Sequence, residues 1–395
     1  MGLRCENMKT LIELYDERPL ENVLSTEVFR PERTVFLCPP EVAADQARQN
    51  KLREYFRHRG VKCECVFISV SLLDAAQVER RLREVTERYP DCALDIAGGT
   101  DAALFAGGLL CGQKDVPVFT YSRKRNTFFN IRHADFAQSL PCPVALSVED
   151  CFLMAGGSMR MGRVDNSVLS RYMDIIEPMF ALYLRHRREW PATVTYIQRV
   201  SQKENDLRAQ GGRTVKGEHG GRVNVPESAL REMEQIGLIR DLSLTEEGVS
   251  FVFRDGQVRA WLRDVGSALE LYVYKACLDL GIFQDVRTSA VVDWLGEKPG
   301  HDSVTNELDV MATAGVTPVF ISCKTCDVKT EALNELAILR DRFGGQIARA
   351  AIVTAERGRS PMRHRAMELG IDVIDLNDLN KKQTLMDRLK ALMRA

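Results

Sequence analysis

Residues 306–325, NELDVMATAGVTPVFISCKT, contain two apolar runs of strand length with a glycine-containing turn between them. Side chains alternate between the two faces of a strand. Glu307 and Asp309 should therefore share one face of the first strand, while Leu308 and Val310 take the other. This stretch predicts a β-hairpin with a polar patch near its open end.

The second strand contributes to the same patch. Alternation places Ser322 and Lys324 on one face, and a turn at residues 314–317 sets Asp309 opposite Ser322. The same register sets Glu307 opposite Lys324. Two carboxylates and one ammonium group should thus lie together, flanked by strongly apolar positions.

Such a group of side chains suits phosphodiester hydrolysis. Carboxylates can hold Mg²⁺ or Mn²⁺, which activates water and shields the phosphate, while an ammonium group orients the water or offsets developing charge. The structural alternative is a cross-strand ion pair between Glu307 and Lys324 that adds little stability. Spacing alone favours this ion pair.

The residues around the hairpin extend the pattern to a mixed α/β domain. The sequence predicts helices over residues 266–281 and 330–343, with three consecutive strands between them. A strand over 349–355, another helix and a strand over 371–376 follow.

The N-terminal part has a different order of elements. Strand-like runs at residues 34–38, 61–68, 92–97 and 116–121 alternate with helices predicted over 41–59, 74–88 and 101–111. Strands that are apolar on both faces and separated by helices indicate a Rossmann-like parallel sheet, with ligands at the carboxyl ends of the strands. One more strand, after the turn at residues 121–126, should close this sheet.

A glycine turn marks a candidate ligand site in this domain. In DIAGGTDAALFAG, residues 95–107, Gly98 and Gly99 let a ligand approach the backbone, and Thr100 is the natural N-cap of a helix whose free N–H groups suit phosphate. An ordinary tight turn is the structural alternative. Further candidates for this pocket are Asp101, Cys38, Pro39, Pro40, residues 16–22 and the basic cluster of residues 123–125, for which solvated charge is the favoured interpretation.

The middle of the chain is helical over residues 166–188 and then polar and glycine-rich over 201–221, which predicts a linker or long hairpin. Residues 226–257 resemble a small winged-helix-like piece, for which we favour a spacer role because its helix has few exposed basic residues. At 395 residues the chain should hold several domains. We expect them at residues 1–150, 151–260 and 261–395.

Composition limits the classes of function. The chain has 54 Lys and Arg against 55 Asp and Glu, which excludes a globally basic nucleic-acid-coating protein but allows a locally basic site. The 11 cysteines are scattered, which favours reduced thiols in a cytoplasmic protein over disulfides or zinc. The longest charge-free run, residues 310–323, is too short to span a bilayer.

Short motifs along the chain resemble a known family. They are DERPLEN at 16–22, the glycine turn at 95–107, GSALELYVY at 266–274, NELDV at 306–310, SCKT at 322–325 and GGQIARAAIV at 344–353. Together they resemble the CARF-domain (CRISPR-associated Rossmann fold) nucleases of type III CRISPR defence. In these proteins an N-terminal domain senses cyclic oligoadenylate, and a C-terminal PD-(D/E)xK, restriction-endonuclease-like domain cuts RNA or DNA.

The resemblance implies roles for individual residues. Asp309, Ser322 and Lys324 match the PD-(D/E)xK signature, and Glu270 matches an acid that some members carry on the preceding helix. Asp309 and Glu270 would then hold Mn²⁺ or Mg²⁺, with Glu307 as a further catalytic candidate. Ser322 stands where the family usually has an acidic residue.

The resemblance also implies an activator and a partner. The Gly98, Gly99, Thr100 and Asp101 run would contact a cyclic oligoadenylate, with cyclic tetra-adenylate as the expected form, although the family often has lysine at the position of Asp101. It further implies a homodimer. A regulator that binds nucleic acid in response to a ligand, with a degenerate nuclease domain, is the alternative that Ser322 keeps open.

Overall fold

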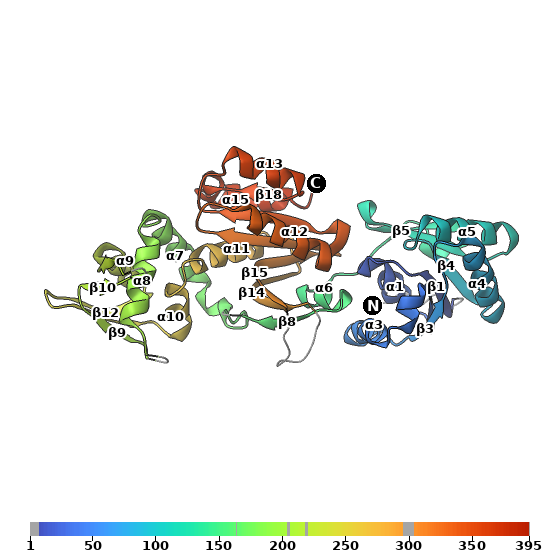
Figure 1. Cartoon of the computed structure of the whole chain (residues 1–395), viewed down its shortest axis with the longest axis horizontal. Coiled ribbons are helices and arrows are strands. Elements are labelled where there is room, and N and C mark those ends of the chain that lie inside the picture. The colour runs from blue at the N-terminus through green and yellow to red at the C-terminus, as the bar shows by residue number, and fades with distance from the viewer. Residues whose placement is uncertain (1–7, 163, 204–205, 218–219, 295–303, 395) are drawn as a thin grey trace.

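The computed structural model describes residues 8–162, 164–203, 206–217, 220–294 and 304–394 and has three parts that lie in a row (Figure 1). The N-terminal α/β domain occupies one end and the C-terminal α/β domain the centre. The segment that lies between them in the sequence forms a small domain at the opposite end. The chain therefore passes the central domain on its way to the far end and then returns to it.

The N-terminal domain contains a seven-stranded sheet in the order β3-β2-β1-β4-β5-β6-β7. The first five strands in this order are parallel, and β6 and β7 are antiparallel, so the predicted Rossmann-like sheet and its closing strand are confirmed. The strands are β1 Thr10–Leu14, β2 Arg33–Cys38, β3 Glu64–Ser69, β4 Cys92–Asp95, β5 Val118–Ser122, β6 Thr127–Arg132 and β7 Leu140–Pro141.

Strand β1, which the sequence pattern does not predict, lies in the middle of the parallel part. All five of its residues are buried. They include Glu13, which lies in register with Asp95 of β4. A carboxylate inside so short a strand interrupts the apolar run by which the other strands are recognised.

Helices connect and cover these strands. They are η1 Pro19–Asn22, α1 Leu24–Phe29, α2 Pro40–Ala44, α3 Gln46–His58, α4 Ala75–Arg88, α5 Asp101–Gln113, η2 Arg123–Arg125, η3 Asp135–Ala137 and α6 Val148–Met154. The single helix predicted over residues 41–59 is divided into α2 and α3. Asp45 has an extended backbone between them, and its side chain accepts a hydrogen bond from Arg48 N, so it caps α3.

The C-terminal domain is built on a six-stranded sheet in the order β18-β17-β16-β15-β14-β8. The three predicted consecutive strands are antiparallel neighbours, and β17 and β18 continue the sheet in parallel. The strands are β8 Ser158–Met161, β14 Asp285–Asp293, β15 Thr305–Ala314, β16 Thr317–Lys324, β17 Arg349–Thr354 and β18 Asp372–Ile374. Strand β8 comes from the segment before the small domain.

Helices cover both faces of this sheet. α11 and α15 share a hydrophobic cluster with Val310 and Ile321, whereas α12 and α13 share another with Leu308 and Phe320. The helices are α11 Ser267–Asp279, α12 Thr330–Gly344, η5 Gly345–Ile347, α13 Ser360–Glu368, α14 Leu376–Leu379 and α15 Lys382–Ala391.

The small domain has a three-stranded antiparallel sheet in the order β12-β13-β9 and a separate two-stranded ribbon, β10-β11. The polar stretch over residues 201–221 thus supplies strands rather than only a linker. The elements are η4 Leu169–Tyr172, α7 Met173–Arg185, α8 Trp190–Val200, β9 Arg208–Gly211, β10 Thr214–Lys216, β11 Arg222–Asn224, α9 Glu227–Gln235, β12 Ile239–Leu244, β13 Val249–Phe253 and α10 Gly256–Leu262.

The N-terminal and C-terminal domains share one hydrophobic cluster. It runs from Phe119 and Phe128 of the first sheet through Phe152 of α6 to Phe320 and Phe343 of the C-terminal domain. Phe152 and Phe343 pack edge to face with ring centroids 5.0 Å apart. The contact between these two domains is therefore part of a continuous core.

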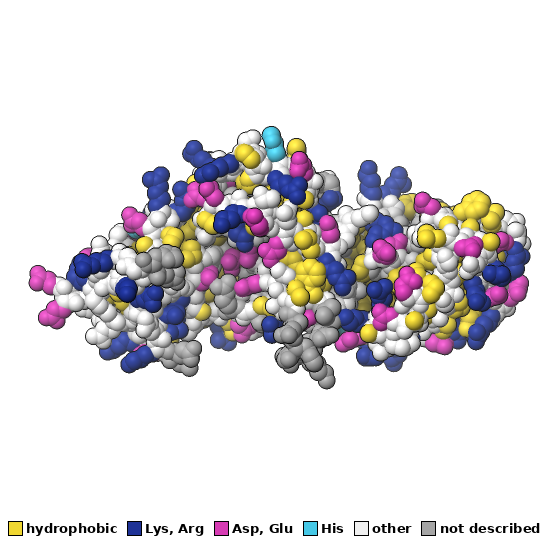
Figure 2. Space-filling view, viewed as in Figure 1, with side chains coloured by type: hydrophobic (Ala, Val, Ile, Leu, Met, Phe, Trp, Pro, Cys, Tyr) yellow, Lys and Arg dark blue, Asp and Glu magenta, His cyan; other side chains and the backbone are white. Residues whose placement is uncertain are grey.

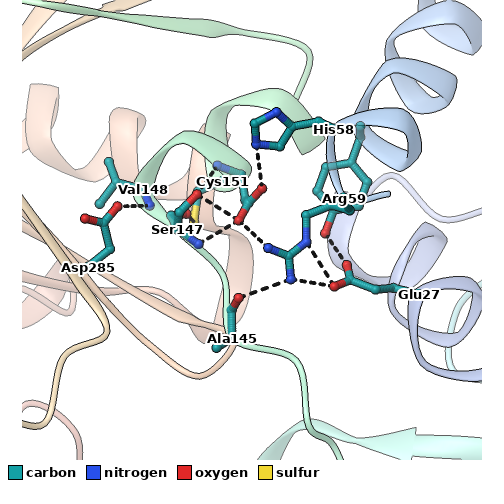
Figure 3. Close-up of polar contacts among 10 residues, drawn as sticks. Glu27, His58, Arg59, Ala145, Ser147, Val148, Cys151 and Asp285 are labelled. Carbon is teal, nitrogen blue, oxygen red and sulfur yellow. Dashed lines mark hydrogen bonds and ion pairs between the residues drawn. The ribbon is translucent and has the colours of Figure 1, made fainter. Parts of the chain in front are cut away.

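A polar network crosses the same junction (Figure 3). Arg59, which follows α3, forms ion pairs with Glu27 of α1 and with Asp150 of α6, the latter at 2.9 Å. Asp150 also accepts hydrogen bonds from the backbone and side chain of Ser147, which caps α6. Val148 N donates to Asp285, the first residue of β14, at 2.9 Å. Ion pairs and hydrogen bonds that meet at α6 thus connect α1 and α3 with β14.

None of the helices in the described ranges is long and apolar enough to cross a membrane. Ten cysteines lie in the described ranges, and all of them are free thiols.

Candidate functional site

The hairpin of β15 and β16 has the predicted register. Val310 pairs with Ile321, and beyond this pair Ser322 Oγ donates to Asp309 Oδ2 at 3.0 Å. Lys324 Nζ lies 3.7 Å from the same oxygen. The structure therefore brings Asp309, Ser322 and Lys324 together at the end of the hairpin.

Asp309 is held firmly in place. Its Oδ2 also accepts a hydrogen bond from Cys323 N at 2.6 Å. Burial raises the pKa of Asp309, and this effect outweighs the lowering by Lys324 and by the two hydrogen bonds. Because all three donors meet Oδ2, the second oxygen, Oδ1, has no donor among the described residues and is free for another ligand.

A local irregularity between β14 and β15 corrects one part of the predicted patch. Ser289 has a φ of 52°, and the pairing of β14 with β15 skips from Thr288–Val310 to Ala290–Leu308. On either side of this point, Leu308 and Val310 join different hydrophobic clusters, whereas strict alternation would put them on one face.

Glu307 lies in the same pocket as Asp309, but its described contact is with β14. Its carboxylate accepts a hydrogen bond from Ser289 Oγ at 2.8 Å. No ion pair or hydrogen bond between Glu307 and Lys324 occurs among the described residues, so the predicted cross-strand ion pair is absent from that part of the chain.

A pocket of about 70 Å³ opens over this end of the hairpin. Glu335, on α12, contributes a third carboxylate to its wall and accepts a hydrogen bond from Asn306 Nδ2 at 2.6 Å. Nothing in the sequence distinguishes Glu335 from the other charged residues of its helix. The full lining is Glu307, Leu308, Asp309, Ile321, Ser322, Lys324, Ala332, Glu335, Leu336 and Leu339.

Glu270 does not line this pocket. It lies in the first turn of α11 and is only 8 % exposed. Burial raises the pKa of the Cys323 thiol, and the charges of Asp309 and Glu270 raise it further, which places both acids near Cys323. Within the described residues, no three His, Cys, Asp or Glu side chains are grouped so that they could hold a metal ion.

The glycine turn of the N-terminal domain is fastened to the loop after β1. Gly99 N donates to Asp16 Oδ2 at 3.0 Å. Gly99 has a φ of +94°, and a Cβ there would lie 2.7 Å from Leu14 Cβ. The absence of a side chain at Gly99 is therefore required by β1 itself, whether or not a ligand binds.

The neighbouring positions have definite structural roles. Gly98 is packed against the same loop, where a Cβ would lie 3.0 Å from Leu14 O. Thr100 caps α5, because its Oγ1 accepts a hydrogen bond from Ala103 N, and it also donates to Leu72 O. Asp101 follows as an exposed residue in the first turn of α5.

The loop at residues 16–22 is ordered by its own polar side chains. Arg18 Nε donates to Asp16 Oδ1 at 2.7 Å, and Asn22 Oδ1 accepts from Asp16 N at 2.9 Å. Burial opposes the ionisation of Asp16, but the bonds from Arg18 and from Gly99 N outweigh it and lower its pKa. Asp16 is therefore a charged clamp that joins this loop to the glycine turn.

Other candidates for the ligand pocket lie differently. Cys38 is fully buried, its pKa is raised to about 12 by burial, and its Sγ lies 3.7 Å from Ile68 O, so the thiol faces the sheet. Pro39 is the N-cap of α2. Arg123 pairs with Glu21 and donates to Gln346 Oε1 at 3.0 Å, so it contacts the C-terminal domain.

A larger hollow, of about 540 Å³, lies beside the loop at residues 16–22. It brings together three cations, Arg48 and Lys51 of α3 and Arg342 of α12. The sequence interpretation does not include these residues, because their proximity depends on the contact between the two domains.

Comparisons with known proteins agree with this arrangement. Residues 259–392 match the family model described as Card1-like, endonuclease domain. A comparison with curated protein sequences gave no match. The fold of the whole chain is similar to that of protein VC1899 from Vibrio cholerae, with a TM-score of 0.77, 18 % identity, and 97 % of this chain and 98 % of that chain covered.

The fold is also similar to that of Can2 from Sulfobacillus thermosulfidooxidans, solved in complex with cyclic tetra-adenylate. The TM-score is 0.70, the identity is 17 %, and 98 % of each chain is covered. Residues 259–392 are thus similar to a Card1-like endonuclease domain, and the whole chain has a fold similar to those of Can2 and VC1899.

Proposed function

We propose that this protein is a nuclease of type III CRISPR defence that is switched on by a cyclic oligoadenylate and cuts RNA or DNA in the cytoplasm. The observation that carries the proposal is the Asp309 carboxylate, 16 % exposed, fixed by Ser322 and facing Lys324 within a domain of endonuclease type. The free thiols of the described cysteines suit a reducing compartment.

The chemistry of the pocket fits a divalent cation. Mg²⁺ and Mn²⁺ prefer oxygen ligands, and the carboxylates of Asp309, Glu307 and Glu335 line its walls. The three carboxylates are not grouped around one point in this structure, so at least one of them would have to move to bind an ion together with the others. A bound ion would lower the pKa of a water molecule and shield the phosphate. Lys324, 36 % exposed and next to Asp309, would orient the attacking water or offset charge on the phosphate.

Ser322 and Glu270 modify this proposal. Ser322 offers a neutral hydroxyl that already donates to Asp309, so we expect the ion to be held weakly. Glu270 lies beyond the pocket wall, close to Cys323, and would support the strand rather than bind the ion directly.

For the activator we propose the carboxyl end of the N-terminal sheet, where the turn from Gly98 to Asp101 meets the loop at residues 16–22. Backbone N–H groups at the start of α5 suit phosphate, and the clamp between Asp16 and Gly99 fixes their position. Cyclic tetra-adenylate is the expected ligand, because Can2, which was solved with it, shares this fold.

We also propose a homodimer that forms through α5. This helix is apolar on all sides, and Phe105 and Leu109 are 63 % and 38 % exposed. Leu73, which is 81 % exposed, follows Leu72, whose carbonyl accepts a hydrogen bond from Thr100 at the start of α5. Hydrophobic side chains gather over this end of the molecule (Figure 2). We expect a second copy of this chain to cover the exposed face of α5, because α5 begins at the turn where we propose that the activator binds. Light scattering after size exclusion should give a dimer for the wild type and a monomer for Phe105→Asp.

One assay tests the activity. Labelled single- and double-stranded RNA and DNA are incubated with Mn²⁺ or Mg²⁺, with and without cyclic tetra- or hexa-adenylate. We expect cleavage by the wild type only with activator and ion, none by Lys324→Ala, and full activity from Lys329→Ala, which removes an exposed lysine next to α12. Activator-dependent cleavage by Lys324→Ala would contradict the site.

A regulator with a degenerate nuclease domain is the second candidate, and Ser322 is the observation that favours it. In that case the wild type would bind the cyclic ligand but cut none of the four substrates at any concentration of Mn²⁺.

A further inference from the structure

The β10-β11 ribbon of the small domain has two faces of different character. Val215 and Val223 are partly buried and pack against the hydrophobic cluster that contains α8. The outer face carries four exposed side chains, and none of them is acidic: Thr214, Lys216, Arg222 and Asn224.

The two cations on this face lie directly opposite each other. Lys216 pairs with Arg222 in the antiparallel ladder. Like charges in that position destabilise a ribbon. Neither side chain has an acidic partner among the residues the structure describes, whereas Arg213 pairs with Glu227 and Arg240 with Asp241. Placing Lys216 opposite Arg222 therefore lowers the stability of the ribbon, and folding alone does not explain this pair.

The segment that contains the ribbon also has more basic than acidic residues. Residues 199–224 contain six Lys or Arg against three Asp or Glu, although the chain as a whole is almost neutral. Helix α9, which a winged helix would use for recognition, has three glutamates and the single cation Arg231. Of these two elements, the ribbon therefore has two cations without a described acidic partner, whereas the single cation of α9 is paired.

We propose that the outer face of the ribbon binds the phosphodiester backbone of a nucleic acid, at a site separate from the Asp309 pocket. Lys, Arg, Thr and Asn are the side chains that commonly contact phosphate oxygens, and a two-stranded ribbon fits the major groove of a duplex. Thr214 Oγ1 donates to Asn224 Oδ1 at 3.0 Å, which leaves the Asn224 amide N–H groups for a ligand. The lack of apolar side chains on this face disfavours a lipid surface or a hydrophobic peptide.

The test measures binding without cleavage, so its outcome does not depend on the proposed nuclease activity. Fluorescence anisotropy of a labelled DNA duplex, and of single-stranded RNA, is followed with the full chain in EDTA over a range of salt concentrations. The variant is Lys216→Gln with Arg222→Gln. The matched control is Arg231→Gln with Arg240→Gln, which removes two cations of the same domain that have acidic partners at 4.0 and 3.0 Å.

We expect the ribbon variant to lower the slope of log affinity against log salt on the duplex by about 1.8, or about 0.9 for each phosphate that is no longer neutralised. Between about 50 and 200 mM salt the wild type should then lose about twelvefold more affinity than the variant. The variant should also melt at the same or a higher temperature than the wild type, because the opposed charges are gone.

An unchanged slope, or an equal decrease of the slope in the control, would overturn the proposal. So would displacement of the duplex by polyglutamate at the same charge concentration, since the surface would then bind acidic polymers in general.

Discussion

Replacing Arg59 by Met should show how much the ion pairs at the domain junction contribute to the stability of the protein. Arg59 is 22 % exposed, while its partners Glu27 and Asp150 are 6 % and 1 % exposed. Removing one member of a buried ion pair leaves uncompensated charge, at a cost of about 3–5 kcal/mol. Because Arg59 keeps some contact with water, we expect the lower end, about 3 kcal/mol.

Urea denaturation followed by circular dichroism measures this decrease in stability. The matched control is Arg81→Met on α4, which breaks a 2.6 Å ion pair with Glu84 whose members are 47 % and 51 % exposed. An exposed pair of this kind contributes less than about 1 kcal/mol. Equal decreases for Arg59→Met and Arg81→Met would refute the reasoning.

We also expect the Arg59 network to contribute to the proposed activation of cleavage by the ligand of the N-terminal domain. It ends at Asp285, which begins β14, so Arg59→Met should retain affinity for cyclic tetra-adenylate while activation of cleavage weakens. Calorimetry and the cleavage assay together check this. Unchanged activation would show that the shared hydrophobic cluster couples the domains without the ion pairs.

Gly99→Ala should lower stability by roughly 1–3 kcal/mol because of its positive φ and the contact with Leu14, whereas Gly112→Ala, with open space around its Cβ, should not; thermal melting of both variants checks this. Ser322→Glu should reduce the Mn²⁺ concentration needed for half-maximal cleavage, because it adds a hard oxygen ligand beside Asp309; an equal or higher requirement would mean that the ion lies elsewhere. Burial raises the pKa of Asp95 to about 7, above the unfolded value of 3.8, so the folded state holds a proton that the unfolded state has lost. Stability should therefore fall as the pH rises from about 4 to 7, at up to about 1.4 kcal/mol per pH unit, and melting curves of Asp95→Asn should lack this part of the pH dependence.

The sequence-based predictions agree with the structure where local patterns determine the fold. Apolar runs separated by amphipathic helices identify the parallel sheet without β1, and the turn at residues 314–317 fixes the register that joins Asp309 to Ser322. Strand β1 is not recognised by such patterns, because it contains the charged residue Glu13. Glu13 is buried only because neighbouring strands lie beside β1 in the folded sheet.

The rest of the candidate site depends on tertiary contacts. Leu308 and Val310 lie on different faces next to Ser289, whose positive φ interrupts the regular strand and which belongs to another strand. Glu335 reaches the pocket only through the packing of α12 on the sheet. The sequence marks Gly99 as a point where a ligand could approach the backbone, but the atom that excludes a side chain in this structure belongs to Leu14, far away in the sequence.

Strand β8 has a practical consequence for anyone who isolates the nuclease-type domain. It pairs with residues 290–293 on the outer edge of β14, yet it lies about a hundred residues before the segment that matches the endonuclease family model. A fragment limited to residues 259–392 would leave a nine-residue edge strand with unpaired N–H and C=O groups. Such an edge is a template for intermolecular pairing, so this fragment should aggregate where the intact chain does not.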